Sequence, residues 1–292
     1  MTPIGTSLRL EAALFQAITA MAVIGCADSD SETAKTSTAN SDLVTDKIAR
    51  GEPLNRSTGS IDRPFVLTGE IWTQFGILVL WDHHQFPGTS MDGEAIRGTP
   101  PSREQVKSAL PILLKCIQVY PEAFIRRLAI QKIVLSSPLF VGDTDVGGCP
   151  DRHGNLFLDL SIDHKHLPIP FHHELFHVVD LRDDESFLDE NWSDLNEEGF
   201  EYCTPSNGTF DFEILNPSDR PGFLTEYSTW SVYEDKAMFF QFMVLNYEHV
   251  EERAFDDPVI ECVFRRSRPR IPDDAGRVFR FKPSGHSVDA EQ

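Results

Sequence analysis

The sequence has no continuous apolar run of the roughly 20 residues that a helix needs to cross a bilayer. Positive charge is also scarce: 26 Lys and Arg residues stand against 46 Asp and Glu residues, a formal net charge of −20 over 292 residues. Such a balance argues against sequence-independent binding to nucleic acid and against direct binding to an anionic membrane, because both are polyanions. With 40% hydrophobic and 10% aromatic residues, the chain can bury a sizeable core, which argues against disorder, a coiled coil or a collagen-like fibre. We therefore expect a soluble body made of one large domain or two small lobes.

Cysteine is scarce as well, with five residues in the chain and no pair in a CxxC arrangement. A cysteine-based zinc site and a thioredoxin-like redox motif therefore have no support. The cysteines after residue 100 are even in number, which would allow two disulfides in an oxidising compartment. Three pairings are possible, and buried free thiols are the alternative. These residues are Cys116, Cys149, Cys203 and Cys262.

The first 26 residues have the order of a bacterial secretory signal. Arg9 supplies one early positive charge, an apolar stretch runs from residue 12 to residue 25, and Cys26 follows the residues Val-Ile-Gly. The tetrapeptide VIGC resembles a lipobox, in which the cysteine carries lipid and becomes the mature N-terminus. The alternative is an amphipathic N-terminal helix with a buried cysteine.

The segment after Cys26 is polar and rich in small residues, as in ADSDSETAKTSTANSD at 27–42. It cannot bury enough apolar surface to offset the entropy lost on ordering. We therefore predict a signal peptide at residues 1–26, a polar tether at 27–63 and one globular domain at 64–292. The protein is expected to be exported, as a membrane-anchored lipoprotein or a periplasmic or extracellular protein that contacts the membrane only through its lipid.

Three patterns predict regular structure before the chemically informative region. Ser102 and Gln105 form a capping-box signal, and apolar residues at helical spacing follow as far as Ile117, so we predict an amphipathic helix there despite Pro111. Apolar runs at 130–135 and at 155–161 (NLFLDLS) predict two strands around a glycine-rich loop. The second strand could be interior, or it could offer its edge to an extended peptide.

The segment FHHELFHVVD at 171–180 contains an HExxH motif formed by His173, Glu174 and His177. On a helix, residues four apart share a face, so both imidazoles can reach one metal ion. Glu174 is displaced by about 100° around the helix and can contact a water molecule on that ion. A chance match is the alternative, but the apolar residues around the motif favour a buried helix and therefore a zinc site.

A catalytic zinc ion normally has three protein ligands, and the sequence offers two glutamates for the third position. The metzincin extension of the motif is absent, because Asp180 and Asp183 occupy the places of its glycine and third histidine. Glu197 lies at a thermolysin-like spacing, but its surroundings carry little helical periodicity. Glu234 opens a strongly helical segment that would hold its carboxylate rigidly. The alternative for Glu234 is a capping box with Ser231.

These motifs resemble those of zinc metallopeptidases related to the catalytic domain of anthrax lethal factor, a branch of the gluzincins. In that family HExxHxxD is followed by a tyrosine and, seven residues later, by the glutamate of an E-D-x-A-E or E-x-x-A-E helix. Here Asp180 completes the first motif, Tyr227 lies seven residues before Glu234, and the sequence from Glu234 to Ala237 matches the last motif. The resemblance covers roughly the last two thirds of the chain.

The segment between the motifs agrees with the same family. The residues from Trp192 to Tyr202 resemble its stretch W-x-x-L-N-x-x-G-F-x-Y, which makes Glu197 a loop residue. Met238 departs from the pattern, because the family has a second glutamate at this position. The departure removes a contact behind the zinc ligands but no direct ligand.

The resemblance implies a zinc-dependent metallopeptidase that acts on a peptide or protein substrate. Zn²⁺ would be held by His173, His177 and Glu234 and would activate a water molecule for attack on the peptide bond. Glu174 would be the general base, and Tyr227 would donate to the oxyanion that develops on the scissile carbonyl.

Two aspartates are expected behind the zinc ligands. Asp180 is a candidate acceptor for an imidazole N–H, and an ordinary surface aspartate is the alternative. Asp235, next to the third ligand, is expected to act in the same layer. We predict an α+β fold in which a small mixed sheet packs on the HExxH helix, and a mainly helical lobe follows and carries Glu234.

The remaining clusters of histidine and arginine predict no site. The pair His83-His84 and the segment 163–166 lack partners at metal-ligand spacing, and we interpret both as solvated loops. His172 is turned by about 100° from His173 and is not expected to be a ligand. The basic segment at 264–270 (FRRSRPR) is interpreted as a solvated terminal face rather than as a site for an acidic lipid headgroup or partner.

A second hypothesis comes from another functional class. The chain could be a lipid-anchored, noncatalytic binding protein that derives from a metallopeptidase. Met238 favours this hypothesis, whereas Glu174 and Tyr227 oppose it, because a purely structural metal site needs no base.

Overall fold

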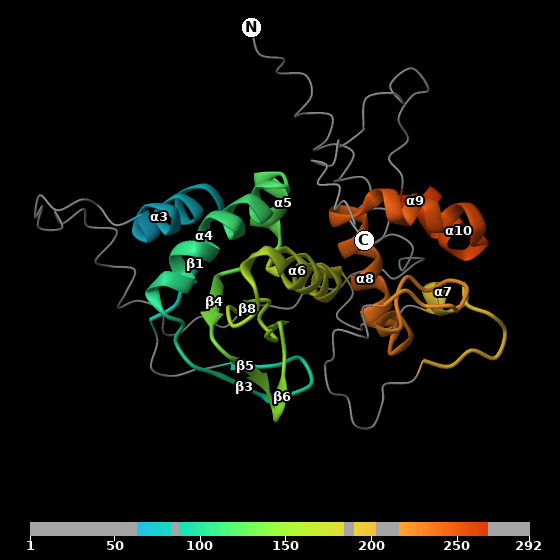
Figure 1. The fold of residues 1–292 in the computed structure, drawn as a ribbon, viewed down its shortest axis with the longest axis horizontal. Coiled ribbons are helices and arrows are strands. Elements are labelled where there is room, and N and C mark those ends of the chain that lie inside the picture. The colour runs from blue at the N-terminus through green and yellow to red at the C-terminus, as the bar shows by residue number, and fades with distance from the viewer. Residues whose placement is uncertain (1–62, 83–87, 184–189, 203–215, 268–292) are drawn as a thin grey trace, which may run out of the picture.

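The fold is known from a computed structural model, which describes residues 63–82, 88–183, 190–202 and 216–267. These residues form helices and two small β-sheets, so the predicted α+β class is confirmed (Figure 1). No helix within these ranges is both long and apolar enough to span a bilayer. The predicted signal peptide with Cys26, the tether up to residue 62, His83-His84, Cys203 and residues 268–270 of the basic segment lie outside the described residues.

The first sheet is mixed and has the strand order β1-β4-β8-β7. The strands β1 (Leu78–Leu80), β4 (Lys132–Ser136) and β8 (Leu156–Asp159) run parallel, and β7 (Gly148–Pro150) pairs antiparallel with β8. All of β8 is buried, because it is paired on both sides. The predicted strand at 155–161 is therefore interior, and the alternative that it offers an edge is wrong.

The second sheet is antiparallel and has the order β2-β3-β5-β6. Its strands are β2 (Gly88–Thr89), β3 (Ala95–Gly98), β5 (Leu139–Val141) and β6 (Thr144–Asp145). The sequence predicted a glycine-rich loop at 141–151, and this prediction is wrong, since β6 and β7 lie there. Strands of two or three residues are too short to show an alternating pattern, which explains the error.

Three helices precede the metal-motif helix: α3 (Arg63–Phe75), α4 (Arg103–Gln118) and α5 (Glu122–Arg127). The predicted helix after Ser102 is confirmed as α4. Its capping box is complete, because Gln105 donates its backbone N–H to Ser102 Oγ and Ser102 donates its own to Gln105 Oε1. Pro111 lies inside this helix, and the helix face with Val106, Leu110 and Ile117 is buried.

The chain after the sheets is mainly helical. It contains α6 (Pro168–Asp183), α7 (Glu190–Ser193), α8 (Val232–Leu245), α9 (Tyr247–Asp256) and α10 (Pro258–Ser267). Figure 1 shows α8 to α10 grouped on the opposite side of α6 from β4 and β8. The predicted helical lobe therefore exists, and α8 packs along α6.

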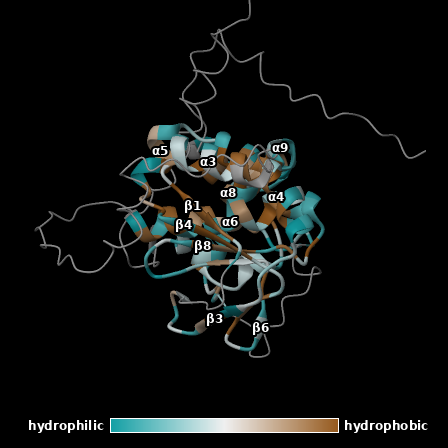
Figure 2. Cartoon of the chain, turned by 90° about the vertical axis from the view of Figure 1, so that its left-hand side faces the viewer, coloured by the Kyte–Doolittle hydropathy of each residue, from teal (hydrophilic) through white to brown (hydrophobic). Residues whose placement is uncertain are grey.

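The main hydrophobic core lies between the first sheet and the helices around it. Figure 2 shows the hydrophobic colour gathered on β1, β4 and β8 and on the helices that face them. Several of its largest side chains are fully buried, and they are Phe124, Phe171, Phe176 and Phe240. Because Phe171 and Phe176 belong to α6 and Phe240 to α8, this core fixes the two helices that carry the metal motif.

The described cysteines are free thiols. Cys116 and Cys149 are buried, and Cys262 is partly exposed. Two disulfides would require all four cysteines after residue 100, so that arrangement is wrong, and the alternative of free thiols holds for these three.

Candidate metal centre

The HExxH motif lies in the middle of α6, where every residue from 171 to 180 is buried. Pro168 begins the helix, a position at which the missing backbone N–H breaks no helical hydrogen bond. His173 and His177 are one turn apart and direct their Nε2 atoms to the same point, 3.0 Å from each other. The predicted buried helix with two imidazoles on one face is therefore confirmed.

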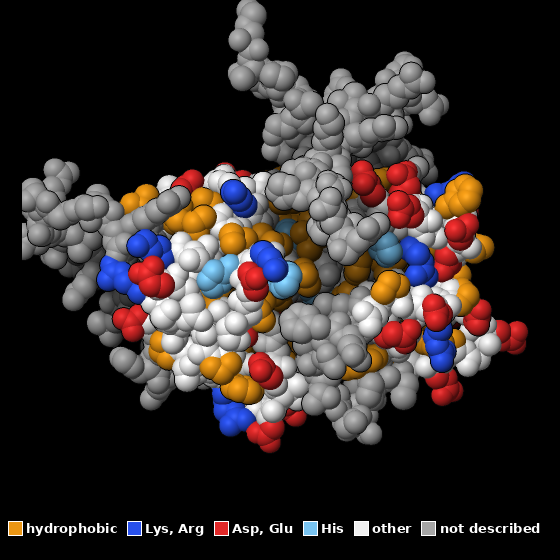
Figure 3. Space-filling view, viewed as in Figure 1, with side chains coloured by type: hydrophobic (Ala, Val, Ile, Leu, Met, Phe, Trp, Pro, Cys, Tyr) orange, Lys and Arg blue, Asp and Glu red, His pale blue; other side chains and the backbone are white. Residues whose placement is uncertain are grey.

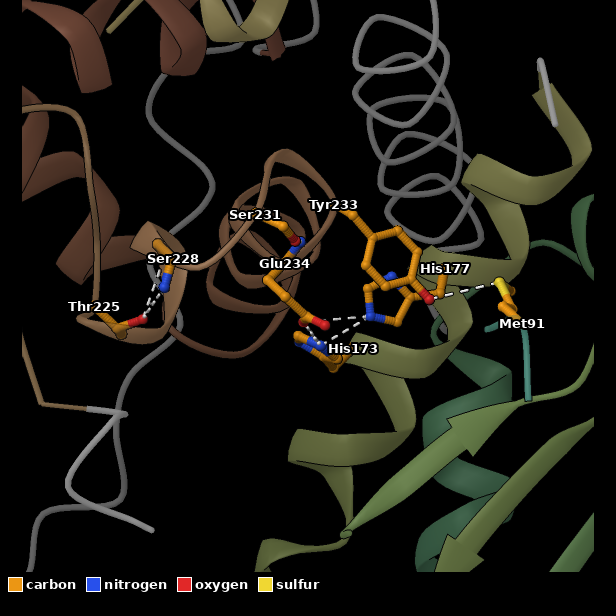
Figure 4. Close-up of polar contacts among 8 residues, drawn as sticks. All are labelled: Met91, His173, His177, Thr225, Ser228, Ser231, Tyr233 and Glu234. Atoms are coloured by element: carbon orange, nitrogen blue, oxygen red, sulfur yellow. Dashed lines mark hydrogen bonds and ion pairs between the residues drawn. The ribbon is translucent and has the colours of Figure 1, made fainter. Parts of the chain in front are cut away.

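Glu234 reaches the same point from α8. The backbone N–H of Glu234 donates to Ser231 Oγ over 3.1 Å, so Ser231 caps the helix, which is one half of the capping-box alternative. The carboxylate does not complete a capping box. Its Oε2 lies 2.8 Å from His173 Nε2 and 3.5 Å from His177 Nε2 (Figure 4). The alternative that this side chain merely caps its own helix is therefore wrong.

The three side chains form a group that could hold a metal ion, since their ligand atoms all lie within 4.8 Å of one another. Zinc bonds to histidine nitrogen and carboxylate oxygen are about 2.0–2.2 Å long, so tetrahedral ligand atoms lie roughly 3.3 Å apart. The observed separations of 2.8, 3.0 and 3.5 Å are close to this value. Two imidazoles and one carboxylate are also a known catalytic zinc donor set. The residues present therefore fit zinc.

Burial and neighbouring charges shift the pKa values of His173, His177 and Glu234 in different directions. Burial would lower the pKa of His173, but the hydrogen bond and charge of Glu234 raise it above its ordinary value. Burial lowers the pKa of His177 to about 4, although the charge of Glu234 opposes this shift. Burial would raise the pKa of Glu234, but the two histidines lower it well below its usual range. The arrangement thus favours a neutral His177 and an ionised Glu234, the forms that bind a metal.

Glu174 is buried on the side of α6 that faces the edge strand β7. Burial raises the pKa of its carboxyl to about 8, with His173 opposing the shift and the charge of Glu234 adding to it. A divalent cation beside the carboxyl would lower this value again. The contact with β7 depends on Gly148, because a Cβ atom at that position would lie 2.7 Å from Glu174 Cγ. The sequence showed this glycine only as part of a supposed loop.

A cavity opens beside the ligand atoms and is lined by both halves of the fold. Its wall includes Gly148, His173 and Glu174 from the sheet side, and Tyr227 and Met238 from the segment that follows. The space-filling view shows hydrophobic side chains around a hollow near the middle of the molecule, with histidine side chains beside it (Figure 3). The cavity can therefore bring a bound molecule against His173 and Glu174.

Tyr227 lies in a short 3₁₀ turn (Tyr227–Thr229) just before α8. The turn is pinned by Thr225 Oγ1, which accepts the backbone N–H of Ser228 over 3.2 Å (Figure 4). The ring centroid of Tyr227 is 5.8 Å from that of His173. Burial raises the pKa of Tyr227 well above 10, and the charges of Glu234 and Glu174 raise it further, so its hydroxyl keeps its proton.

Asp180 is buried, which excludes the surface alternative. Its carboxylate accepts a hydrogen bond from the ammonium group of Lys236, and both side chains are almost completely buried. His177 Nδ1, one turn earlier on α6, makes no hydrogen bond with any described residue. The prediction that Asp180 accepts a hydrogen bond from this imidazole is therefore wrong. Asp180 instead joins α6 to α8 through Lys236.

Asp235 is also buried, but it faces away from the imidazoles. Its Oδ2 accepts hydrogen bonds from Trp192 Nε1 at 2.8 Å and from the Tyr202 hydroxyl at 3.0 Å. Burial raises the pKa of Asp235 to about 7, although these bonds oppose the shift. The prediction that Asp235 supports a metal ligand is therefore wrong. Asp235 instead joins the segment 190–202 to α8.

The structure adds Tyr233, which the sequence analysis did not single out. Its ring stacks on the imidazole of His177, with centroids 3.5 Å apart and planes 11° apart (Figure 4). Its hydroxyl donates to Met91 Sδ at 3.6 Å. The only signal in the sequence is its position next to Glu234, and the face it presents depends on how α8 docks on α6.

Other predicted non-ligands are placed as follows. Glu197 is exposed in a turn after α7 and takes no part in the metal group, so the thermolysin-like alternative is wrong. His172 is not a ligand, as predicted; its Nδ1 pairs with the Tyr120 hydroxyl at 2.6 Å. The segment 163–166 was interpreted as a solvated loop. This is wrong for His164 and His166, because residues His164–His166 form a short 3₁₀ helix in which both histidines are half-buried, and His166 lines the cavity.

Comparison with known proteins adds no assignment, since no family model, no curated protein and no solved structure matches the chain.

Proposed function

We propose that the protein is a zinc metallopeptidase. The observation that carries this proposal is the convergence of His173, His177 and Glu234 within one small volume, with Glu174 of the same HExxH motif beside them on the cavity wall. A purely structural zinc site is normally closed by four protein ligands and needs no carboxylate base, whereas catalytic sites keep an open position. Among the described residues the metal group has three side chains, and two members of the motif, His173 and Glu174, line a cavity, which supports a catalytic role.

When bound, zinc would supply Lewis-acid chemistry and make a water molecule nucleophilic near neutral pH. Glu174 would take the proton of this water, because it lies on the cavity wall one residue after the first ligand. Tyr227 would donate its hydroxyl proton in a hydrogen bond to the carbonyl oxygen as negative charge develops there. The raised pKa of Tyr227 supports this role, because the hydroxyl remains a donor over the whole neutral range.

The substrate that the site would suit is an extended peptide. Among the described residues, β7 is the outer strand of the first sheet on the side away from β1, and its Gly148 borders both Glu174 and the cavity. A peptide that adds to this edge as a further strand would present its carbonyl groups to the ligand atoms. Side-chain preference would then depend on the apolar part of the wall, including Met238.

We also propose, from the resemblance of the motifs, that the domain is related to the gluzincins of the lethal factor type. Export as a lipoprotein anchored through Cys26 is part of the same proposal and rests on the order of Arg9, the apolar stretch at 12–25 and the VIGC sequence. The second candidate is the noncatalytic binding protein, which Met238 favours. Met238 lines the cavity where the family has a carboxylate, so the cavity has lost a polar contact but no metal ligand.

The test compares the full chain with two variants. The parent should retain about one zinc equivalent after dialysis and cleave members of an unbiased peptide library, with activity abolished by a chelator. Glu174→Gln should keep zinc affinity within a few-fold and lose roughly 100-fold or more in rate, since general-base catalysis typically contributes 10²–10⁴. Tyr227→Phe should lose on the order of 100-fold in turnover with little change in substrate binding.

Each outcome assigns the protein to one class. Zinc binding below roughly half an equivalent would reject the metal site itself. A full zinc equivalent with no cleavage of any library peptide would favour the binding protein. Parent-like activity in Glu174→Gln would show that this glutamate is not the base.

A further inference from the structure

The two imidazoles of the candidate metal centre are held in different ways. His173 shares a side-chain hydrogen bond with Gln241, a buried residue of α8. His177 has no such partner among the described residues, because its Nδ1 is buried and makes no hydrogen bond. Metal-ligating histidines usually donate their second ring N–H to an acceptor, and this bond fixes the plane of the ring. His177 must be oriented by something else.

The face of the His177 ring is covered by Tyr233. Their centroids are 3.5 Å apart and their planes differ by 11°, so the two rings are in full parallel contact. Rotation of the imidazole about its Cβ–Cγ bond would drive its edge into the tyrosine ring, which lies flat against its face. The stack therefore restricts the ring torsion of His177, which together with the torsion about its Cα–Cβ bond decides where Nε2 points.

Tyr233 is itself held at its far end. Its hydroxyl donates to Met91 Sδ, and Figure 4 shows that it points away from the ligand atoms toward Met91. Met91 sits in the turn between β2 and β3, which is closed by the hydrogen bonds Ser90 N–H to Glu94 O at 2.8 Å and Gly93 N–H to Ser90 O at 3.0 Å. The ring is thus fixed between α8 and the hairpin of the second sheet.

We propose that Tyr233 is the positioning residue of His177, and that the β2–β3 hairpin, through Met91, holds this tyrosine in place. Tyr233 does not line the cavity, unlike Tyr227, so it acts on the metal ligand and does not contact a bound molecule there. The stacked ring of Tyr233 is what orients His177, and the hydroxyl group of Tyr233 has a secondary role. The inference rests on the proposed zinc site but is independent of peptidase activity.

The test measures metal binding by the full chain. The zinc dissociation constant is obtained by competition with a chromophoric chelator, and the ligand geometry is read from the visible absorption spectrum of the Co²⁺ form. The variants are Tyr233→Leu, which removes the ring, and Tyr233→Phe, which keeps it. The matched control is Phe242→Leu, since Phe242 is a partly buried aromatic residue of the same helix that packs on the core. All measurements are made well below the melting temperature of the least stable variant.

Tyr233→Leu should weaken zinc binding by at least about tenfold and alter the Co²⁺ spectrum, as expected for loss of an orienting contact. Tyr233→Phe should stay within about threefold of the parent, and Phe242→Leu should match the parent in both measurements. Met91→Ala, which removes the whole side chain that contacts the far end of the tyrosine and not only its hydrogen bond, should give an intermediate loss. It also serves as the decisive variant if Tyr233→Leu does not fold.

Two results would overturn the inference and leave the proposed function intact. One is a parent-like affinity and spectrum in Tyr233→Leu, or in Met91→Ala where the first variant is unfolded. The other is a loss in Tyr233→Phe as large as that in Tyr233→Leu, because the hydroxyl and not the stacked ring would then be responsible. Absence of zinc binding by the parent is a different result, and it would reject the metal site on which the inference depends.

Discussion

Lys236 and Asp180 allow a direct measurement of how α8 is held against α6. Their side chains are 7% and 6% exposed, and the ammonium group donates to Asp180 Oδ1. The perturbation is Lys236→Met, which keeps the length of the side chain and leaves the carboxylate buried without its cation. The companion variant is the double substitution Asp180→Leu with Lys236→Met, which removes both charges at similar volume.

The expected magnitudes follow from the burial. Removing one partner of a buried ion pair costs about 3–5 kcal/mol, because the remaining charge has lost its compensation. This cost is not reduced by solvent screening, because both side chains are almost completely buried. Replacing both partners by apolar side chains is often neutral or stabilising. We therefore expect Lys236→Met to lower the free energy of unfolding by about 3–5 kcal/mol and the double variant to recover most of that loss.

The assay is urea denaturation of the metal-free protein in excess chelator, since bound metal would add its own linkage to the measured stability. In thermal melts, the same single substitution should lower the midpoint by roughly 6–20 °C, at about 2–4 °C per kcal/mol for a domain of this size. The control is Arg265→Met, which breaks the exposed pair with Glu261, whose side chains are 72% and 44% exposed. Exposed pairs contribute about 0.2–1 kcal/mol, so this variant should remain close to the parent.

The reasoning would be refuted if Lys236→Met cost no more than Arg265→Met. It would also be refuted if the double variant were as unstable as the single one, because the loss would then come from packing and not from an uncompensated charge.

The remaining predictions concern the ligand set, the edge strand and a thiol. Glu234→Ala should weaken zinc binding by about tenfold or more, whereas Glu197→Ala should leave it nearly unchanged; chelator competition measures both. Gly148→Ala should lower peptidase activity by roughly tenfold while zinc is retained, because the new Cβ would lie 2.7 Å from Glu174 Cγ and move the base. Burial raises the pKa of Cys116 to about 12, so at pH 8 its thiol should be alkylated at least about 100-fold more slowly in the folded than in the unfolded protein, as measured by mass spectrometry.

Each of these three predictions has a control or an outcome that would contradict it. A reversal of the Glu234 and Glu197 effects would restore the thermolysin-like ligand set. Gly147→Ala is the control for the edge strand, because a Cβ there would meet no atom closer than 3.6 Å; equal losses in both glycine variants would contradict the argument from the contact with Glu174. Rapid alkylation of native Cys116 would show that α4 opens readily.

Local sequence determined the features that depend on a few neighbouring residues. The two imidazoles share a face because an α-helix has 3.6 residues per turn, so the spacing of His173 and His177 fixed their geometry before any tertiary contact. The helix starts at Ser102 and Ser231 followed from capping, which also acts within one turn. Glu234 was preferred to Glu197 as the third candidate ligand because it opens a strongly helical segment and matches the family motif seven residues after Tyr227.

Tertiary structure alone decided what lies across from these residues. Gly148 and β7 border Glu174 because the strand pairs with β8, and a three-residue strand carries no readable periodicity. Asp180 pairs with Lys236, and Tyr233 stacks on His177, only because α8 packs on α6 in one register, 56 residues apart along the chain. Periodicity tells which face of a helix is buried. The partner that meets that face is set by the packing of elements far apart in sequence, and the burial that shifts the pKa values of Glu174 and Glu234 arises from the same packing.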